Sequence, residues 1–306
     1  LAAVDPDRDL TACLPALVAA GDSIGTTSRD CARRFGLPAG IPVATGGGDN
    51  MMAAIGTGNV VAGRLTMSLG TSGTLFAYSD SPVVDRSGNI AAFCSSTGGW
   101  LPLLCTMNCT SATELIRGSL DIALEAFDET IAGVAAGCGG LTVLPFFSGE
   151  RTPNLPGARA EILGLTPTNA TKAHLLRATV EGVTFGLRFG LDELRRLGVE
   201  AGEIVLTGGG AGSLHWRQIV ADICNLPVTM SERDEGACFG AALQALWMLE
   251  RVTEPTRSIV EITARHVRPV AQVAPDTESV AIYERTYAAY RSAVARAAES
   301  STARLR

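Results

Sequence analysis

Apolar runs at strand spacing mark the first third of the chain. Residues 41–44 form a short apolar run, and a helix is predicted to begin near Asp49, after a glycine turn. Residues 64–70 and 73–79 are β-like runs separated by two polar residues with glycine on both sides. This connection is typical of a tight antiparallel hairpin.

Helical spacing is prominent in the second half. The longest pattern spans residues 172–197, where leucine and valine recur at helical spacing and Gly198 supplies a stop signal. After it the pattern alternates, with strands predicted at 203–207 and 227–231 and helices at 214–225, 236–249 and 278–298. The last residues, 302–306, are expected to fray. The alternation of strands and helices predicts an α/β protein.

Composition and charge narrow the possible functions. The 306 residues are 46% hydrophobic, which is enough for a sizeable core, and the net charge is -6 with a pI near 5.2. We expect no nucleic-acid partner, because such proteins carry a basic patch or stripe. No apolar stretch is long enough for a membrane span and no signal core is visible, so we expect no membrane association and a cytoplasmic location.

The eight cysteines give little reason to expect a metal. They are scattered through a chain too large to need disulfides, so most are interpreted as small buried hydrophobic residues. Cys105 and Cys109 form the one suggestive pair, but a metal site would need further cysteine or histidine ligands at workable spacing. We therefore expect no structural metal site.

Glycine-rich turns follow strands at three places in the chain. Backbone N–H groups in tight turns and at helix N-termini bind anions, and glycine lets the backbone approach phosphate oxygens closely. The sequence has no P-loop motif, and no dinucleotide fingerprint with its ribose-binding acid, which argues against a dehydrogenase. The pattern indicates phosphate handling by a different nucleotide-binding fold.

Five segments together resemble a known family. "ATGGGDN", "SLGTSG", "PFFSGERTPN", "ILGLTP" and "LTGGGAGSLHWRQIVADICNLPV" resemble, in that order, successive motifs of the FGGY carbohydrate kinases. The resemblance implies an α/β actin-like ATPase (ribonuclease H-like) fold, with ATP in the cleft between two domains. It also implies phosphoryl transfer from ATP, with Mg²⁺, to a sugar hydroxyl.

The resemblance begins partway through the family's sequence. It implies that residues 1–59 are the end of a first, sugar-binding domain and that residues 60–306 form the second, nucleotide-binding domain. The partners expected on this basis are ATP and a small sugar, and a homodimer is possible. The expected sugar is a pentulose, D-xylulose, with ribulose, gluconate and sugar alcohols as alternatives.

The segment "GGGDN" carries the expected catalytic residue. Taken alone, an aspartate between a glycine turn and a helix is most often an N-cap, although its position also suits a proton acceptor. The resemblance assigns Asp49 as the catalytic base and Asn50 as a sugar contact. A noncatalytic actin-like protein, which binds nucleotide for assembly or regulation, needs no base beside a sugar hydroxyl.

Two further glycine segments are expected to hold ATP. The resemblance places phosphate ligands in the hairpin loop, at Gly70, Thr71 and Ser72. It places adenosine against the later loop and the helix beginning at residue 236, with Gly208, Gly209, Gly210, Ala211, Ser213 and Gly236 as ligands. Without the resemblance, the first is an ordinary hairpin turn and the second a loop capped by Ser213.

Several neighbouring residues carry smaller expectations. The family commonly has arginine where this chain has Gly212, which leaves the backbone pocket but removes any side-chain contact. We expect Gly210→Val to block nucleotide and disturb a positive φ. Glu150 and Arg151 are interpreted as an ion pair, Trp216 as a core residue, and three acids as solvated: Asp222, Asp234 and Glu235.

Overall fold

The computed structural model describes residues 4–232 and 236–304. Its centre is a seven-stranded mixed sheet in the order β11-β10-β9-β3-β4-β6-β5. Strands β3, β9 and β10 run parallel, and each of the other neighbouring pairs is antiparallel. The strands are β3 (Gly63–Leu69), β4 (Gly73–Ala77), β5 (Ala91–Cys94), β6 (Trp100–Cys105), β9 (Ala201–Thr207), β10 (Val228–Ser231) and β11 (Pro269–Val273).

The predicted hairpin is confirmed. Strand β3 pairs antiparallel with β4, and Leu69 lies opposite Gly73 across a loop of residues 70–72. Its central position in the sheet follows from its side chains, because Leu65, Met67 and Leu69 are fully buried. The loop therefore projects from a strand with neighbours on both sides.

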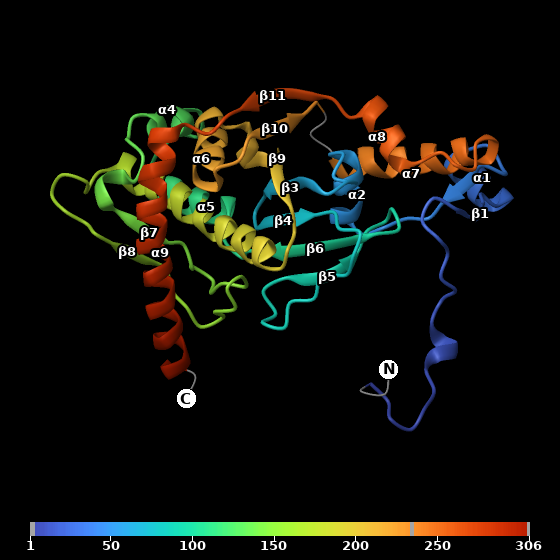
Figure 1. Cartoon of the computed structure of the whole chain (residues 1–306), viewed down its shortest axis with the longest axis horizontal. Coiled ribbons are helices and arrows are strands. Elements are labelled where there is room, and N and C mark those ends of the chain that lie inside the picture. The colour runs from blue at the N-terminus through green and yellow to red at the C-terminus, as the bar shows by residue number, and fades with distance from the viewer. Residues whose placement is uncertain (1–3, 233–235, 305–306) are drawn as a thin grey trace.

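One large core joins the sheet to three helices, α5 (Lys172–Arg196), α6 (Leu214–Cys224) and α9 (Thr277–Arg304). Figure 1 shows these helices grouped at one end of the molecule, with α4 (Phe127–Ala132) beside α6. Helix α3 (Thr110–Ser119) packs on α5. The predicted helices are confirmed, but α9 continues through Arg304 instead of fraying after residue 301. Residues 305–306 of the expected frayed end lie outside the described part.

A second group of helices surrounds α2 (Asp49–Gly56) at the other end of the molecule (Figure 1). Helix α7 (Gly236–Thr253) crosses α2 so closely that a Cβ on Gly240 would lie 1.7 Å from the Met52 carbonyl oxygen. Glycine lets the two backbones meet there. Met52, Ile55, Leu243 and Trp247 then share one apolar cluster.

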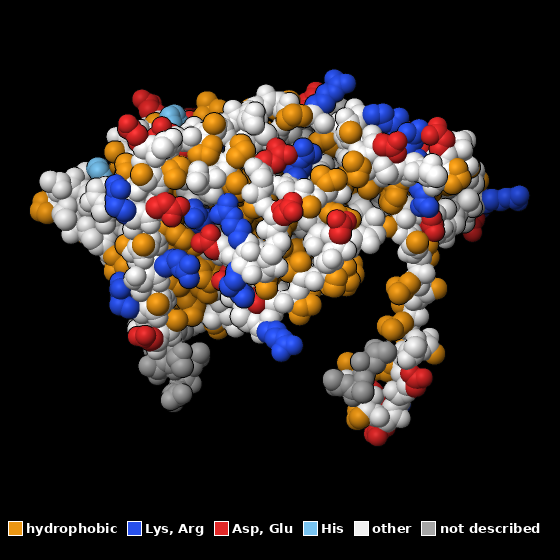
Figure 2. All heavy atoms as spheres, in the orientation of Figure 1, with side chains coloured by type: hydrophobic (Ala, Val, Ile, Leu, Met, Phe, Trp, Pro, Cys, Tyr) orange, Lys and Arg blue, Asp and Glu red, His pale blue; other side chains and the backbone are white. Residues whose placement is uncertain are grey.

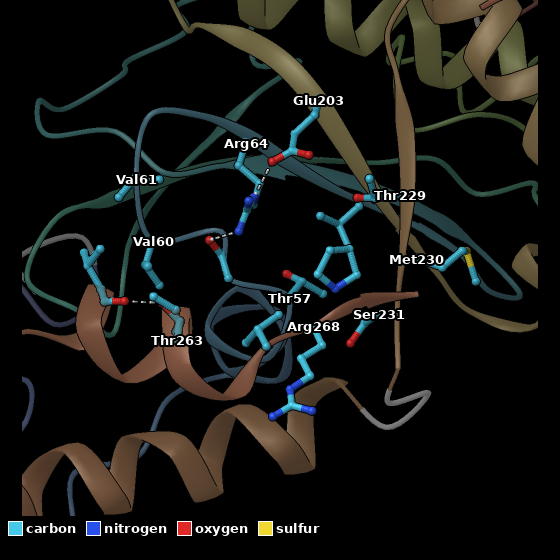
Figure 3. A pocket seen from close by; sticks show the side chains of 16 residues that line it. Thr57, Val60, Val61, Arg64, Glu203, Thr229, Met230, Ser231, Thr263 and Arg268 are labelled. Carbon is cyan, nitrogen blue, oxygen red and sulfur yellow. Dashed lines mark hydrogen bonds and ion pairs between the residues drawn. The ribbon is translucent and has the colours of Figure 1, made fainter. Parts of the chain in front are cut away.

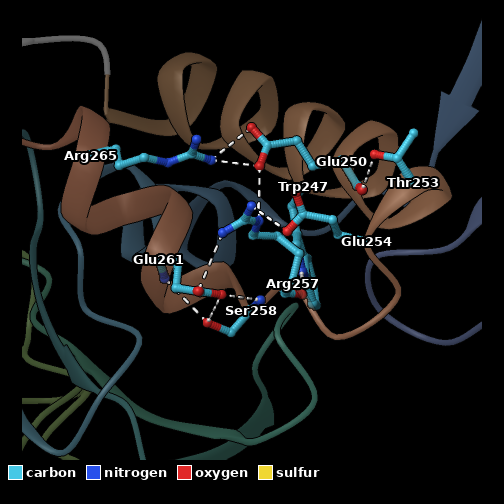
Figure 4. Close-up of polar contacts among 8 residues, drawn as sticks. All are labelled: Trp247, Glu250, Thr253, Glu254, Arg257, Ser258, Glu261 and Arg265. Carbon is cyan, nitrogen blue, oxygen red and sulfur yellow. Dashed lines mark hydrogen bonds and ion pairs between the residues drawn. The ribbon is translucent and has the colours of Figure 1, made fainter.

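Ion pairs fasten α8 (Ile259–His266) to α7 (Figure 4). The Arg257 side chain lies 3.1 Å from Glu250 and 3.3 Å from Glu261, and its carbonyl accepts a 2.8 Å hydrogen bond from the Trp247 indole. Ser258 and Glu261 form a capping box at the start of α8. The unit of α2, α7 and α8 is therefore tied by polar contacts as well as by its apolar cluster.

The N-terminal region is more exposed than the rest. It contains α1 (Arg29–Phe35) and a two-stranded sheet of β1 (Ser23–Thr26) and β2 (Pro42–Ala44). Figure 2 shows the chain before this sheet as an extension with hydrophobic side chains on its surface, and Leu17 is 99% exposed. The predicted domain boundary near residue 60 stays a prediction. The apolar cluster that α2 shares with later helices contains residues from both sides of that boundary.

Smaller elements complete the fold and settle two expectations. Strands β7 (Thr142–Leu144) and β8 (Glu161–Leu163) form a separate pair, and short 3₁₀ helices cover Thr11–Cys13, Leu124–Ala126, Cys138–Gly140 and Gly209–Gly212.

Asp222 was expected to be solvated, which is wrong, because it is 4% exposed. Burial raises the pKa of Asp222, although the Asp276 N–H and the Gln218 side chain donate hydrogen bonds to its carboxylate. Asp234 and Glu235 lie outside the described residues. Across the described ranges, the helices are too short or too polar to cross a membrane.

Candidate functional site

The hairpin loop is fixed from behind by the start of α3. Both the N–H and the hydroxyl of Thr110 donate to the Gly70 carbonyl, at 2.9 and 2.8 Å. The Thr71 carbonyl accepts from the Ser111 hydroxyl at 2.9 Å and from Cys109 N–H at 3.2 Å. Within the described part of the chain, the N–H groups of Thr71 and Ser72 have no protein partner. The loop therefore has its Gly70 and Thr71 carbonyls occupied and N–H donors available for an anion.

The second glycine loop packs directly on the end of β3. Gly208 has φ of 85°, and a Cβ there would lie 2.7 Å from the backbone carbon of Leu69. A positive φ and a backbone neighbour both require glycine. This close packing brings the loop after β9 beside the strand that ends in the hairpin loop.

A cavity of about 450 Å³ opens between this second loop and α3. Trp216 lies among its lining residues, 1% exposed, with its indole N–H bonded to Thr184 at 3.0 Å, so the prediction of a core residue is confirmed. The size and the mixture of apolar and polar groups are those of a small-molecule site. The cavity is lined by Thr110, Thr113, Glu114, Leu124, Phe127, Asp128, Gly209, Gly210, Gly212, Ser213 and Trp216.

The expected adenosine ligands divide into two sets. Gly209, Gly210 and Ser213 line the cavity, whereas Gly208 and Ala211 support the loop from inside, and Ala211 is 1% exposed. Gly236 lies elsewhere, at the start of α7. A Cβ there would contact Ala53 of α2 and Thr57, the residue after α2. The structure therefore brings three of these six residues to the cavity wall.

The three glycines on that wall differ in what a side chain would meet. A Cβ on Gly210 would lie 2.9 Å from both Leu69 and Trp216, and its φ is not positive. The expected positive φ at Gly210 is therefore wrong, and Gly210→Val would also strain the core at Leu69 and Trp216. A Cβ on Gly209 or Gly212 would meet nothing within 4 Å.

Sequence reasoning missed the opposite wall of the cavity. Thr113 and Glu114 come from α3, and Phe127 and Asp128 come from α4. No phosphate or nucleotide motif marks these positions, and about 80 residues separate them from the glycine loop. The pairing of β3 with β9 and of β4 with β6 brings α3 beside the glycine loop, and α4 is placed there by packing on α5 and α6.

Asp128 joins α4 to the glycine loop. Its carboxylate accepts a hydrogen bond from the Ser213 hydroxyl, and it lies 2.8 Å from His215 Nδ1 and 3.1 Å from His215 N. Burial opposes ionisation, but the hydrogen bonds from Ser213 and His215 outweigh it and hold the Asp128 pKa below its usual value. Ser213 is also the N-cap of α6, accepting from Trp216 N–H at 3.0 Å.

Asp49 occupies the first position of α2 and is exposed. The helix cap is Gly48, and Asp49 Oδ1 accepts from N–H and the side-chain amide of Asn50, at 2.8 and 3.2 Å. The N-cap interpretation of Asp49 is therefore wrong, and its second oxygen remains available. Both residues lie beside a separate cavity of about 640 Å³, which residues 45–48, Met51 and Trp100 help to line.

A third cavity, of about 360 Å³, lies between α8, the end of α2 and strands β3, β9 and β10 (Figure 3). Arg64 and Glu203 face each other there with 2.6 Å between Nε and Oε1. None of the residues predicted from the sequence lines it. Over the ranges that the structure describes, no three His, Cys, Asp or Glu side chains are grouped to hold a metal ion.

The interpretation of Glu150 and Arg151 as an ion pair is wrong. Glu150 is 4% exposed, whereas Arg151 is exposed, and the contact between them is from the Arg151 backbone N–H to Glu150 Oε1 at 2.7 Å. Glu150 turns inward because Met107 N–H and the Asn108 amide also donate to it, at 2.6 and 3.0 Å. A buried carboxylate is tolerated where such donors replace water.

Comparison with known proteins explains this arrangement. The C-terminal domain of the FGGY family of carbohydrate kinases matches residues 65–249, and the N-terminal domain of that family matches residues 1–56. This chain belongs to the FGGY family of carbohydrate kinases. Its fold is accordingly the predicted actin-like ATPase fold.

Similar proteins include several xylulose kinases. The xylulose kinase of Haemophilus influenzae is 42% identical over 290 residues, covering 93% of this chain and 57% of that protein, and the Escherichia coli one is 32% identical over 295 residues, with coverage of 93% and 57%. A solved xylulose kinase from Bifidobacterium adolescentis has a TM-score of 0.73 at 33% identity, covering 89% of this chain and 53% of that one. The chain thus spans little more than half the length of these FGGY proteins.

Proposed function

We propose that the chain forms the nucleotide-binding part, and carries the catalytic base, of an ATP-dependent sugar kinase that converts D-xylulose to D-xylulose 5-phosphate. The observation that carries the proposal is the 450 Å³ cavity formed by the glycine loop and α3, next to a hairpin loop with unoccupied N–H donors. Similarity to xylulose kinases supports the choice of sugar. A cytoplasmic location and a possible homodimer also remain predictions.

In this proposal adenosine lies in the cavity and the phosphates reach the hairpin loop. Gly209 and Gly212 leave space for the nucleoside, and the N–H groups of Thr71 and Ser72 donate to phosphate oxygens. The exposed side chain of Leu124 offers the base an apolar contact, and Glu114 supplies acceptors at the rim. Each role uses a group that the protein interior leaves accessible.

Asp49 acts on the sugar. Its free carboxylate oxygen takes the proton as the sugar hydroxyl oxygen bonds to the γ-phosphorus and the bond to the bridging oxygen of ADP breaks. The transition state is loose, so the position of the base matters more than its basicity. That position is well defined, because α2 packs against α7 and against Phe76 and Leu101 of the sheet.

Mg²⁺ fits this donor set as an ion carried mainly by ATP. It commonly binds substrate phosphates with one or two protein carboxylates, and Asp49 is a carboxylate that could serve. When bound, Mg²⁺ neutralises charge on the phosphates. The protein residues bind and orient the nucleotide and the sugar.

The proposal is tested with a protein of the full length of these relatives that contains this chain. Sugar-dependent ADP release is measured with D-xylulose, ribulose, hexuloses, gluconate and polyols. We expect the highest kcat/KM with D-xylulose. A higher kcat/KM with another sugar would identify that sugar, and not D-xylulose, as the substrate. ATP hydrolysis that does not depend on any sugar would favour the noncatalytic actin-like alternative.

A further inference from the structure

The proposed function leaves a buried ionisable group without a role. Glu150 lies in the "SGERTP" segment with its carboxyl group in the interior, 4% exposed. Its backbone is held by reciprocal hydrogen bonds with Leu155, both 2.9 Å long. Burial raises its pKa, while the surrounding donors act in the opposite direction. An apolar side chain would fill such a site without placing charge in the interior.

The carboxylate binds the segment that precedes α3. Oε1 accepts from Met107 N–H at 2.6 Å, and Oε2 accepts from the Asn108 side-chain amide at 3.0 Å. The same amide also donates to the Gly149 carbonyl at 2.7 Å, so its orientation is fixed. Nearby, the Thr152 hydroxyl donates to the Cys105 carbonyl at 3.0 Å. Residues 149–152 therefore hold residues 105–108 in place through hydrogen bonds to both main-chain and side-chain atoms.

The next three residues hold the hairpin loop. Cys109, Thr110 and Ser111 all donate to the Gly70 or Thr71 carbonyls, at 2.8 to 3.3 Å. Thr110 is in addition a lining residue of the 450 Å³ cavity. The Glu150 carboxylate is therefore connected to the proposed phosphate loop, and to one wall of the proposed nucleoside site, by hydrogen bonds at both ends of the short chain segment 107–111.

We propose that Glu150 is a positioning residue for the nucleotide: its carboxylate fixes residues 107–110, and these hold the phosphate loop in its binding conformation. The inference rests on the proposed function for the identity of the ligand. The tie between Glu150 and the loop can be measured without any ligand. Glu150 acts through the loop and touches neither substrate.

The test compares Glu150→Gln with Arg151→Gln. Glutamine keeps one acceptor oxygen for Met107 N–H, but it presents an NH₂ group to the Asn108 amide, which is also a donor. Arg151→Gln keeps the backbone N–H that Glu150 accepts and changes only an exposed side chain. Hydrogen exchange is followed in a peptide covering residues 105–111, whose N–H groups at Met107 and at residues 109–111 bond to Glu150 or to the loop carbonyls, with α6 as the internal reference.

We expect Glu150→Gln to speed exchange in this peptide about tenfold, as the loss of a hydrogen bond to a charged group implies. Exchange in α6 should not change, and Arg151→Gln should match the wild type. Unchanged exchange at residues 109–111, which hold the loop, would overturn the proposal. If Glu150→Gln does not fold, Asn108→Ala should show a smaller increase in the same peptide, and no increase there would overturn the proposal equally.

Kinetics of a full-length protein then separate positioning from general stability. Glu150→Gln should raise the KM for ATP about tenfold, with the KM for the sugar unchanged. A uniform loss of melting temperature with an unchanged KM for ATP would contradict positioning. If exchange changes as expected but the wild type binds no adenine nucleotide, the structural tie stands and the proposed function is what fails.

Discussion

The two glycine segments that resemble family motifs, at residues 46–48 and 208–212, differ in what surrounds them. A Cβ on Gly208 would meet the Leu69 backbone, whereas a Cβ on Gly47 would meet the ends of the Ser96 and Met52 side chains, which can move. The loop at 208–212 is therefore fixed by its neighbours. The turn at 46–48 is exposed, and helix α2 behind it supplies the rigidity. The proposed nucleotide site is therefore held by loop packing, and the proposed base is positioned by a helix.

The largest effect is expected at the exposed turn. Asp49→Asn removes the proton acceptor but keeps the side chain's shape, so turnover of the full-length enzyme should fall by about 10² to 10⁴. Stability should change by less than about 1 kcal/mol, because Gly48 is the helix cap and, among the described residues, the Asp49 carboxylate bonds only to Asn50. Turnover and urea unfolding are measured together; near-normal turnover would end the catalytic assignment.

The next effect separates the two glycine segments by stability. Gly208→Ala should lower the free energy of unfolding by about 2 kcal/mol or more, because φ is positive and the backbone of Leu69 cannot move away. Gly47→Ala should cost below about 1 kcal/mol, since the neighbouring side chains can adjust. Denaturant unfolding of both variants measures the two losses of unfolding free energy. Equal losses would contradict the claim that the loop at 208–212 is held more rigidly than the turn at 46–48.

A smaller effect is expected on nucleotide binding alone. Gly209→Val places a branched side chain in open cavity space and should weaken ADP binding at least about tenfold, or 1.4 kcal/mol, without lowering the melting temperature. Gly210→Val is the matched contrast, because its side chain meets Leu69 and Trp216 and should lower the melting temperature. Calorimetric ADP titration and thermal unfolding are measured for both variants. Normal ADP binding by Gly209→Val would show that the nucleotide does not bind in this cavity.

The smallest effect concerns the charge that joins α4 to the glycine loop. The pKa of Asp128 is lowered in the fold, so its contribution is present above the unfolded pKa of about 4 and is lost as pH falls through the lower folded value. Asp128→Asn should therefore cost at most about 1 kcal/mol at pH 7, because the carboxylate is 35% exposed. The difference in unfolding free energy between the wild type and Asp128→Asn should shrink as the pH is lowered toward 3. A difference that does not change with pH would mean that the lost stability comes from packing and not from charge.

Local patterns were sufficient to predict the elements that carry the site. The hairpin, the helix beginning at Asp49 and the order of β9, loop and α6 all follow from spacing and glycine positions. The cavity wall at Thr113 and Asp128 did not follow, because strand pairing over long sequence distances creates it. Glu150 was misjudged for a related reason: its partners, Met107 and Asn108, are about 40 residues away, whereas Arg151 is adjacent.

The most direct test of the central claim is an ADP titration of this chain followed by amide and methyl NMR. The account predicts binding, at millimolar concentrations, that shifts resonances of Thr110, Thr113, Gly209 and Gly212 around the cavity. Affinity should be higher in a full-length protein, where more of the first domain is expected to add contacts. No shifts at millimolar ADP, or shifts confined to the cavity of Arg64 and Glu203, would contradict it.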